Sequence, residues 1–152
     1  MGAEAGEALR YADYAVADRL SGKPAAVDLA SDPEARRFRT RLREGAAEGP
    51  NFAGHFTIVS WHCGTDCQVL AVVDARSGAV TFAPFLSEFG QEFRIDSRLL
   101  ITNPPSEIRK LLDDPGVCPA PPSLAWVTTR YFEWNGEEFR FIAEKGICPN
   151  SG

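Results

Sequence analysis

The chain has 152 residues, of which 44% are hydrophobic and 24% are charged, with a formal net charge of −5 at pH 7. This length suits one domain with a substantial core, and the acidic balance gives no electrostatic argument for binding nucleic acid or an anionic membrane. No apolar run approaches the ~20 residues that a membrane-spanning helix requires. Ten Phe, three Trp and three Tyr beside one Met indicate a core of aromatic and β-branched side chains, which is typical of sheets.

Residues 1–30 carry little pattern, apart from the stretch LRYADYAV, which predicts a short edge strand. A helix is predicted over residues 31–48, where Ser31 or Asp32 can cap the first turn. Its apolar side chains recur at helical spacing and predict a buried stripe of Ala35, Phe38, Leu42 and Ala46. Five arginines occupy the other faces of this helix, which is more typical of a solvated surface than of a docking site for an anionic partner.

Residues 52–143 alternate between strand patterns and turn signals. β-Branched and aromatic residues predict a strand over HFTIVSW, and a hairpin follows with its turn at Ser77-Gly78. Two short strands flank Asp96-Ser97, a short helix is inserted near residues 105–112, and a last hairpin turns at Asn135-Gly136. Tight turns join antiparallel neighbours. The predicted fold is therefore α+β in a single domain over residues 1–152, an antiparallel meander of about six strands with the first helix packed on it.

The four cysteines lie beside Gly, Pro or polar residues in loop-like contexts, which suggests disulfide bonds made in an oxidising compartment. Three pairings are possible, and the short spacing in CGTDC favours Cys63–Cys67 together with Cys118–Cys148. We expect the short ring to stabilise the fold by ~2 kcal/mol and the long ring by ~3.5 kcal/mol. Disulfides place the protein in the periplasm or outside the cell, and we expect that a targeting segment was removed ahead of this chain.

Both histidines and two cysteines fall within NFAGHFTIVSWHCGTDCQ. A zinc site of His55, His62, Cys63 and Cys67 is opposed by strand geometry, because residues 55 and 62 face opposite sides. A thiol nucleophile is opposed by the ~26 Å between His55 and Cys63 along a strand, and a redox-active disulfide stays a weaker alternative. The segment could also form a recognition surface made of Asn51, His55, Trp61, His62, Thr65 and Asp66. A structural corner is the favoured interpretation.

The chain contains no nucleotide-binding, zinc-protease or serine-hydrolase motif. The sequence therefore favours an exported, disulfide-stabilised, non-enzymatic domain that recognises a protein or envelope component as an inhibitor or accessory factor, without a cofactor. The alternative is a metal-binding or thiol-redox protein, enzymes included, centred on the cysteine loop. The sequence predicts neither the partner nor the oligomeric state.

Two further segments accompany the NFAGHF and WHCGTDC motifs, namely VVDARSGAV and TRYFEWNG. Together they make the chain resemble an uncharacterised family of small secreted bacterial proteins with the pattern N-F-A-G-H-[FY]…W-x-C-G-T-x-C. The resemblance spans roughly residues 8–143 and implies export through a cleaved signal peptide. It implies no catalytic residues, and the chain departs from the pattern at His62, where the family has glycine.

Overall fold

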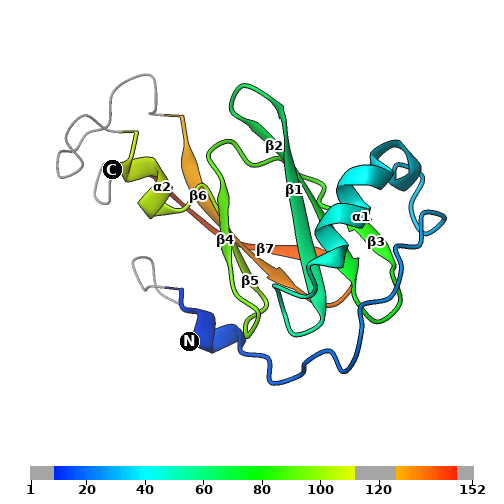
Figure 1. The fold of residues 1–152 in the computed structure, drawn as a ribbon. Coiled ribbons are helices and arrows are strands. Elements are labelled where there is room, and N and C mark those ends of the chain that lie inside the picture. The colour runs from blue at the N-terminus through cyan, green and yellow to red at the C-terminus, as the bar shows by residue number, and fades with distance from the viewer. Residues whose placement is uncertain (1–8, 112–125, 147–152) are drawn as a thin grey trace.

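The computed structural model describes residues 9–111 and 126–146, which form two antiparallel sheets with short helices on their outer sides (Figure 1). The first sheet contains, in spatial order, β1 (Phe56–Gly64), β2 (Cys67–Asp74) and β3 (Val80–Phe82). The second contains β4 (Gln91–Phe93), β5 (Leu99–Thr102), β6 (Thr128–Trp134) and β7 (Phe139–Gly146). The helices are two 3-10 turns, η1 (Tyr11–Tyr14) and η2 (Ala35–Phe38), and two α-helices, α1 (Arg39–Ala47) and α2 (Pro105–Arg109).

The strands confirm the α+β class with antiparallel pairing but not the single meander of six strands. The described residues contain seven strands divided between the two sheets. The physical reason lies in β2, where Leu70 and Val72 join the core between the sheets while Ala71 and Val73 join the core beneath α1. A strand that is apolar on both faces needs a cover on each face. One sheet and one helix cannot supply both covers and also bury the aromatic side chains of the later strands.

The local hairpin predictions are confirmed. β2 pairs with β3 through Val73 and Val80, and the turn between them ends at Gly78. β6 pairs with β7 from Trp134 and Phe139 onward, across the predicted Asn135-Gly136 turn. The inserted helix is α2, one short turn that begins at a proline, as expected for residues with fixed φ at a helix start.

The first helix is shorter and begins differently from the prediction. The backbone makes the 3-10 turn η2 before α1, and the start of α1 has no side-chain cap. Ser31 does not cap a helix: its Oγ donates to the Asp28 carbonyl oxygen (2.6 Å) and accepts the Val80 N–H (2.8 Å). The buried stripe is nevertheless as predicted, because Ala35, Leu42 and Ala46 are buried and Phe38 packs against the same core.

The outer face of the second sheet is covered by the start of the described chain. Leu99, Ile101 and Tyr131 form a small core there, with Tyr11 and Tyr14 of η1 packed on it. The edge strand predicted over LRYADYAV is therefore wrong, since a 3-10 turn places both tyrosines on the sheet and only one isolated bridge, Ala15 to Ser97, remains. None of the helices in the described ranges is long and apolar enough to cross a membrane.

Candidate functional site

The NFAGH motif forms a structural corner immediately before β1. The Asn51 Nδ2 donates to the Ile58 carbonyl oxygen (3.1 Å), and the Ile58 N–H donates to the Asn51 Oδ1 (2.8 Å). The side chain therefore satisfies the outer edge of β1 as a neighbouring strand would. Ala53 and Gly54 then take positive φ angles of 49° and 92°, which reverses the chain into the strand.

The corner binds a long N-terminal segment, residues 16–28, which we call the strap. Figure 1 shows the strap running along the lower edge of the molecule from η1 toward α1. Its contact with the corner is close: a Cβ on Gly54 would lie 2.4 Å from the Asp18 carbonyl oxygen. At the β2–β3 turn, a Cβ on Gly78 would lie 2.0 Å from the Ala26 carbonyl oxygen. Glycine is therefore required at both positions for the strap to lie on the sheet edge.

His55 joins the corner to the strap and to the end of β2. Its Nδ1 lies 2.9 Å from the Asp74 Oδ1, and its Nε2 lies 3.7 Å from the Asp18 Oδ2. The Arg76 guanidinium donates to Asp18 (2.7 Å) and to the Arg19 carbonyl oxygen (3.2 Å). The hydrogen bond from Arg76 is the largest cause that lowers the pKa of the Asp18 carboxyl, so Asp18 stays ionised at neutral pH.

An aspartate that orients a histidine is also the arrangement of a general base, so the site must be tested as a catalytic dyad. A nucleophile would have to hydrogen-bond to the free ring nitrogen of His55. Within residues 9–111 and 126–146, the groups beside the imidazole are the two carboxylates and the Phe56 ring, 4.2 Å away between centroids. No hydroxyl or thiol hydrogen-bonds to the imidazole in these ranges, and the geometry supports a clamp on the strap.

The most exposed functional candidates lie at the opposite end of β1, in the hairpin tip, residues 62–67. This hairpin is the uppermost of the coloured elements in Figure 1. Residues 62–66 are all exposed, and a disulfide joins Cys63 to Cys67 with a Cα–Cα distance of 5.2 Å. Asp66 has a positive φ of 54°, so the backbone reverses within a very short turn. The ring therefore holds a short loop in one conformation.

The structure separates the residues of the predicted recognition surface. His62, Thr65 and Asp66 lie together on the exposed tip. Asn51 and His55 belong to the corner, about 23 Å away along β1 from His62 at the usual rise per residue. These two histidines share no site, and both sulfurs of the tip are in the disulfide. The weak metal alternative of His55, His62, Cys63 and Cys67 is therefore not assembled, and no metal-like cluster occurs among the described residues.

Trp61 is the clearest correction to the predicted surface. Its side chain is only 6% exposed and packs beneath the first helix, with its ring centroid 4.9 Å from that of Phe38. It faces inward because it shares the α1-facing side of β1 with Val59. The second predicted disulfide, Cys118–Cys148, lies outside the described residues.

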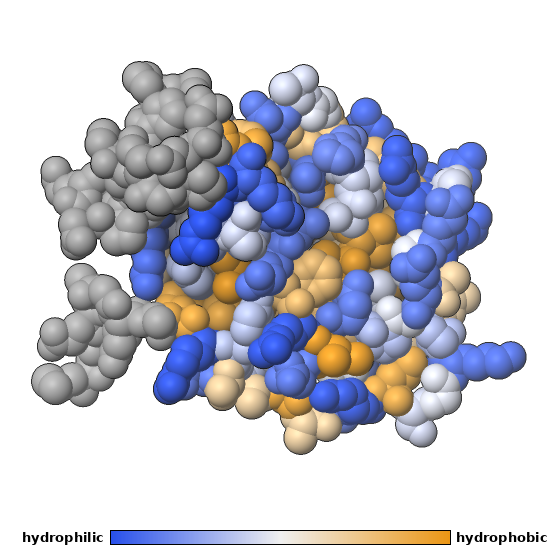
Figure 2. Space-filling view, turned by 60° about the vertical axis from the view of Figure 1, so that its left-hand side comes forward, coloured by the Kyte–Doolittle hydropathy of each residue, from blue (hydrophilic) through white to orange (hydrophobic). Residues whose placement is uncertain are grey.

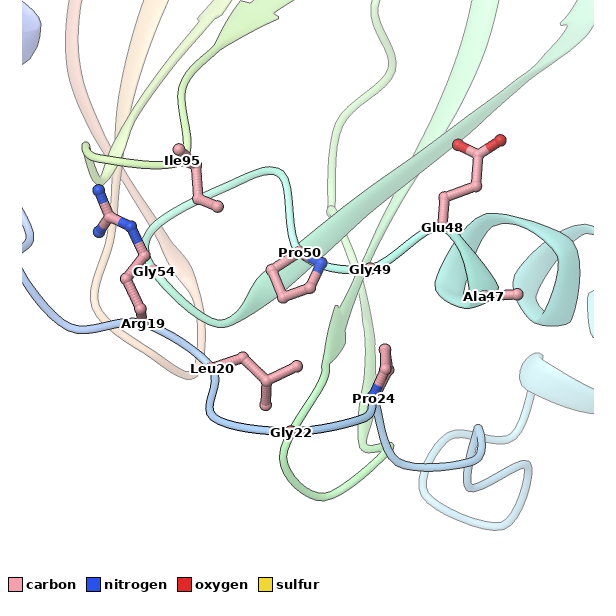
Figure 3. Close-up of a pocket in the computed structure, with 10 residues that line it drawn as sticks. All are labelled: Arg19, Leu20, Gly22, Pro24, Ala47, Glu48, Gly49, Pro50, Gly54 and Ile95. Carbon is pink, nitrogen blue, oxygen red and sulfur yellow. The ribbon is translucent and has the colours of Figure 1, made fainter.

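A hollow of about 330 Å³ lies between the strap and the end of α1 (Figure 3). Its centre is apolar, with Leu20, Pro24 and Pro50 directed toward it. The charged side chains of Arg19 and Glu48 point away from this centre in Figure 3. Ligand pockets combine apolar walls with convergent polar groups, and no charged side chain converges on this hollow in Figure 3.

Exposed large apolar side chains are few and scattered, and Figure 2 shows apolar patches interleaved with hydrophilic side chains on the face in view. No family model, curated protein or solved structure matches the chain. Sequence reasoning missed Asp18 and Arg76 as members of the corner. Arg76 lies in the noted D-A-R-S-G turn, but the pairing spans 58 residues of sequence and has no local signal.

Proposed function

We propose that this protein is an exported binding domain, and that the hairpin tip is its recognition element. The observation that carries the proposal is the run of exposed residues 62–66 on a hairpin closed by the Cys63–Cys67 disulfide. Elsewhere in the described chain, the polar residues that the sequence singled out hydrogen-bond to the protein itself, as Asn51 and His55 do. The tip presents His62, Thr65 and Asp66 outward.

A clasped loop suits recognition for an energetic reason. Binding orders a flexible loop at a cost of roughly 0.5–1.5 kcal/mol per immobilised side chain, and a loop that is already ordered avoids part of this cost. The five-residue ring from Cys63 to Cys67 also removes about 2 kcal/mol of chain entropy from the unfolded state. The projecting shape of the hairpin favours a concave partner surface, such as the cleft of an enzyme that an inhibitor enters.

The disulfide also supports the proposed location. Such bonds persist in the periplasm and outside the cell, whereas cytosolic thiols are kept reduced. We infer export, and a protein or envelope component as the partner.

The test is capture of a partner from an envelope extract with the immobilised protein. We expect His62→Ala/Thr65→Ala to lose the captured partner without unfolding the protein, because both residues are exposed. The matched control is Glu137→Ala/Glu138→Ala, two exposed residues at another hairpin turn, which should capture as the parent does. Equal capture by the tip variant would refute the proposal. Trp61→Ala is unsuitable, because its loss would disturb the core.

A thiol-redox function is the second candidate, and the exposure of Cys63 favours it because an attacking thiolate can reach that sulfur. Intact mass after alkylation, in a glutathione buffer series, distinguishes the two functions. A structural clasp should stay oxidised at the poise of the cytosol, whereas a redox centre should be reduced there. Capture that is unchanged in Cys63→Ser/Cys67→Ser would also count against the preorganised tip.

A further inference from the structure

A cluster of arginines lies at the end of η2 and the start of α1. We call it the arginine run and define it as residues 36–43. This run contains Arg36, Arg37, Arg39, Arg41 and Arg43 and no acidic residue. All of these arginines are exposed in the structure. A protein with a net charge of −5 thus concentrates almost a third of its sixteen basic residues in eight positions.

The arginines are largely unpaired. Arg37 lies 3.8 Å from the Glu34 carboxylate, and both side chains are mostly exposed, so this pair contributes little. Within residues 9–111 and 126–146, Arg36, Arg39, Arg41 and Arg43 have no carboxylate at ion-pair distance, and the Arg39 guanidinium donates to the Arg36 carbonyl oxygen (3.1 Å). Their charges are therefore available to a partner without breaking an internal ion pair.

Three of the arginines lie in one row. The backbone N–H of Arg39 and its guanidinium (3.1 Å) both donate to the Arg36 carbonyl oxygen, which holds Arg39 one turn after Arg36. Residues four apart are neighbours on an α-helix, which places Arg39 beside Arg43. Guanidinium groups bind carboxylates in a bidentate manner, so this row is suited to carboxylates that are closely spaced.

The start of the arginine run lies toward the hairpin-tip end of β1. The Arg37 guanidinium lies 5.2 Å from the centre of the Phe38 ring, and Phe38 packs on Trp61, which directly precedes the tip. The other end of α1 lies farther back along β1, where a Cβ on Gly45 would lie 2.6 Å from Val59. α1 therefore runs alongside β1 with its arginine-rich start toward the tip, as Figure 1 also shows.

Acidic residues limit the length of this surface. Glu34 precedes the run, and Glu44 and Glu48 follow it on α1. The run itself is only about 12 Å long at the rise of an α-helix. A long, uniformly charged polyanion would meet these carboxylates at both ends and an acidic protein beyond them. A short acidic segment would meet only the arginines.

Resting on the proposed function of the tip, we propose that the partner is a protein with a short acidic segment, which docks on Arg36, Arg39 and Arg43 while the tip enters the neighbouring cleft. Electrostatic complementarity of this kind accelerates association and fixes the orientation of the partner. Such a partner would explain why Arg36, Arg39 and Arg43 have no carboxylate partner within the described residues, at the end of α1 that faces the tip.

The test measures the fluorescence anisotropy of a labelled hexapeptide of alternating Glu and Asp against the full chain at low salt. We expect saturable binding that weakens between about 20 mM and 150 mM salt as screening increases. Arg36→Gln/Arg43→Gln should bind about fivefold more weakly, since two exposed ion pairs are lost. The control Lys23→Gln/Arg109→Gln removes the same charge from two exposed residues elsewhere and should bind as the parent does.

The outcomes separate this inference from the proposed function. Equal losses in the two variants, or no binding of the acidic peptide, would overturn the acidic-segment proposal. Tighter binding of heparin or of anionic phospholipid vesicles than of the hexapeptide would also overturn it in favour of another polyanion. The envelope capture depends on the tip variant, so it can succeed while the arginine row fails. If the arginine row binds the hexapeptide and the tip variant still captures the envelope partner, the role of the tip is refuted.

Discussion

Replacement of Gly54 by alanine tests whether the strap is an integral part of the fold. Gly54 has a φ of 92°, and its new Cβ would lie 2.4 Å from the Asp18 carbonyl oxygen. The left-handed backbone costs an L-residue about 1–2 kcal/mol. The overlap is with backbone and can be relieved only by movement of the strap, which adds about 1–3 kcal/mol, as in an overpacked core. We expect a total destabilisation of about 2–5 kcal/mol.

Gly136→Ala separates the two contributions. Gly136 has a φ of 100° with nothing within 4 Å of its Cβ position, so this control carries the backbone strain without the overlap. Urea unfolding should show a loss of about 1–2 kcal/mol for the control and clearly more for Gly54→Ala. Limited trypsin digestion should cleave Gly54→Ala faster after Arg19, which lies in the strap and is followed by Leu20. Equal unfolding midpoints and equal cleavage rates for the two variants would refute the close docking of the strap.

Three further substitutions probe other parts of the molecule by urea unfolding. Gly45→Ala should destabilise by about 1 kcal/mol although alanine favours helices, because its Cβ would lie 2.6 Å from the stiff, buried Val59 side chain. A gain in stability would contradict the tight packing of α1. Asn103→Ala should lose about 2–4 kcal/mol, since the buried side chain makes hydrogen bonds to the 88–89 backbone and to β6. Wild-type stability there would show that the network is dispensable. Hydrogen bonding to Arg140 lowers the pKa of Glu133, which means that ionised Glu133 stabilises the folded state. This contribution to the free energy of unfolding is complete above about pH 4.5 and is lost as pH falls through the folded-state pKa. Glu133→Gln should flatten the acid end of the stability curve, and an unchanged curve would refute the assignment.

The sequence was sufficient where a local pattern determines a local structure. The Asn135-Gly136 turn is an example, because the preference of this pair for positive φ angles is a property of two adjacent residues. The buried stripe through Leu42 and Ala46 is another, since helical spacing alone places both side chains on one face. The Cys63–Cys67 bond was predictable because a five-residue segment leaves its ends close together.

Predictions failed where the outcome depends on distant parts of the chain. The apolar run of β2 fits a strand buried on both faces, but nothing in it specifies which elements cover those faces. Trp61 was assigned to a surface because it lies beside the cysteines, whereas the docking of α1 decides its burial. The strap has no periodicity, because backbone carbonyl oxygens and an ion pair with Arg76 hold it in place. Such contacts leave no pattern in the strap's own sequence.

The two sequence motifs that look most like a functional signature have different roles in the structure. NFAGH and DARSG meet at one sheet edge, where their glycines admit the strap and His55 joins Asp18 to Asp74. Their residue types are explained by this fit, so they require no ligand. The tip differs, because Thr65 and Asp66 are exposed beyond the needs of the fold and the disulfide restrains them there. We therefore propose that a partner recognises these side chains, which the fold does not use and which the disulfide restrains, together with the arginine row.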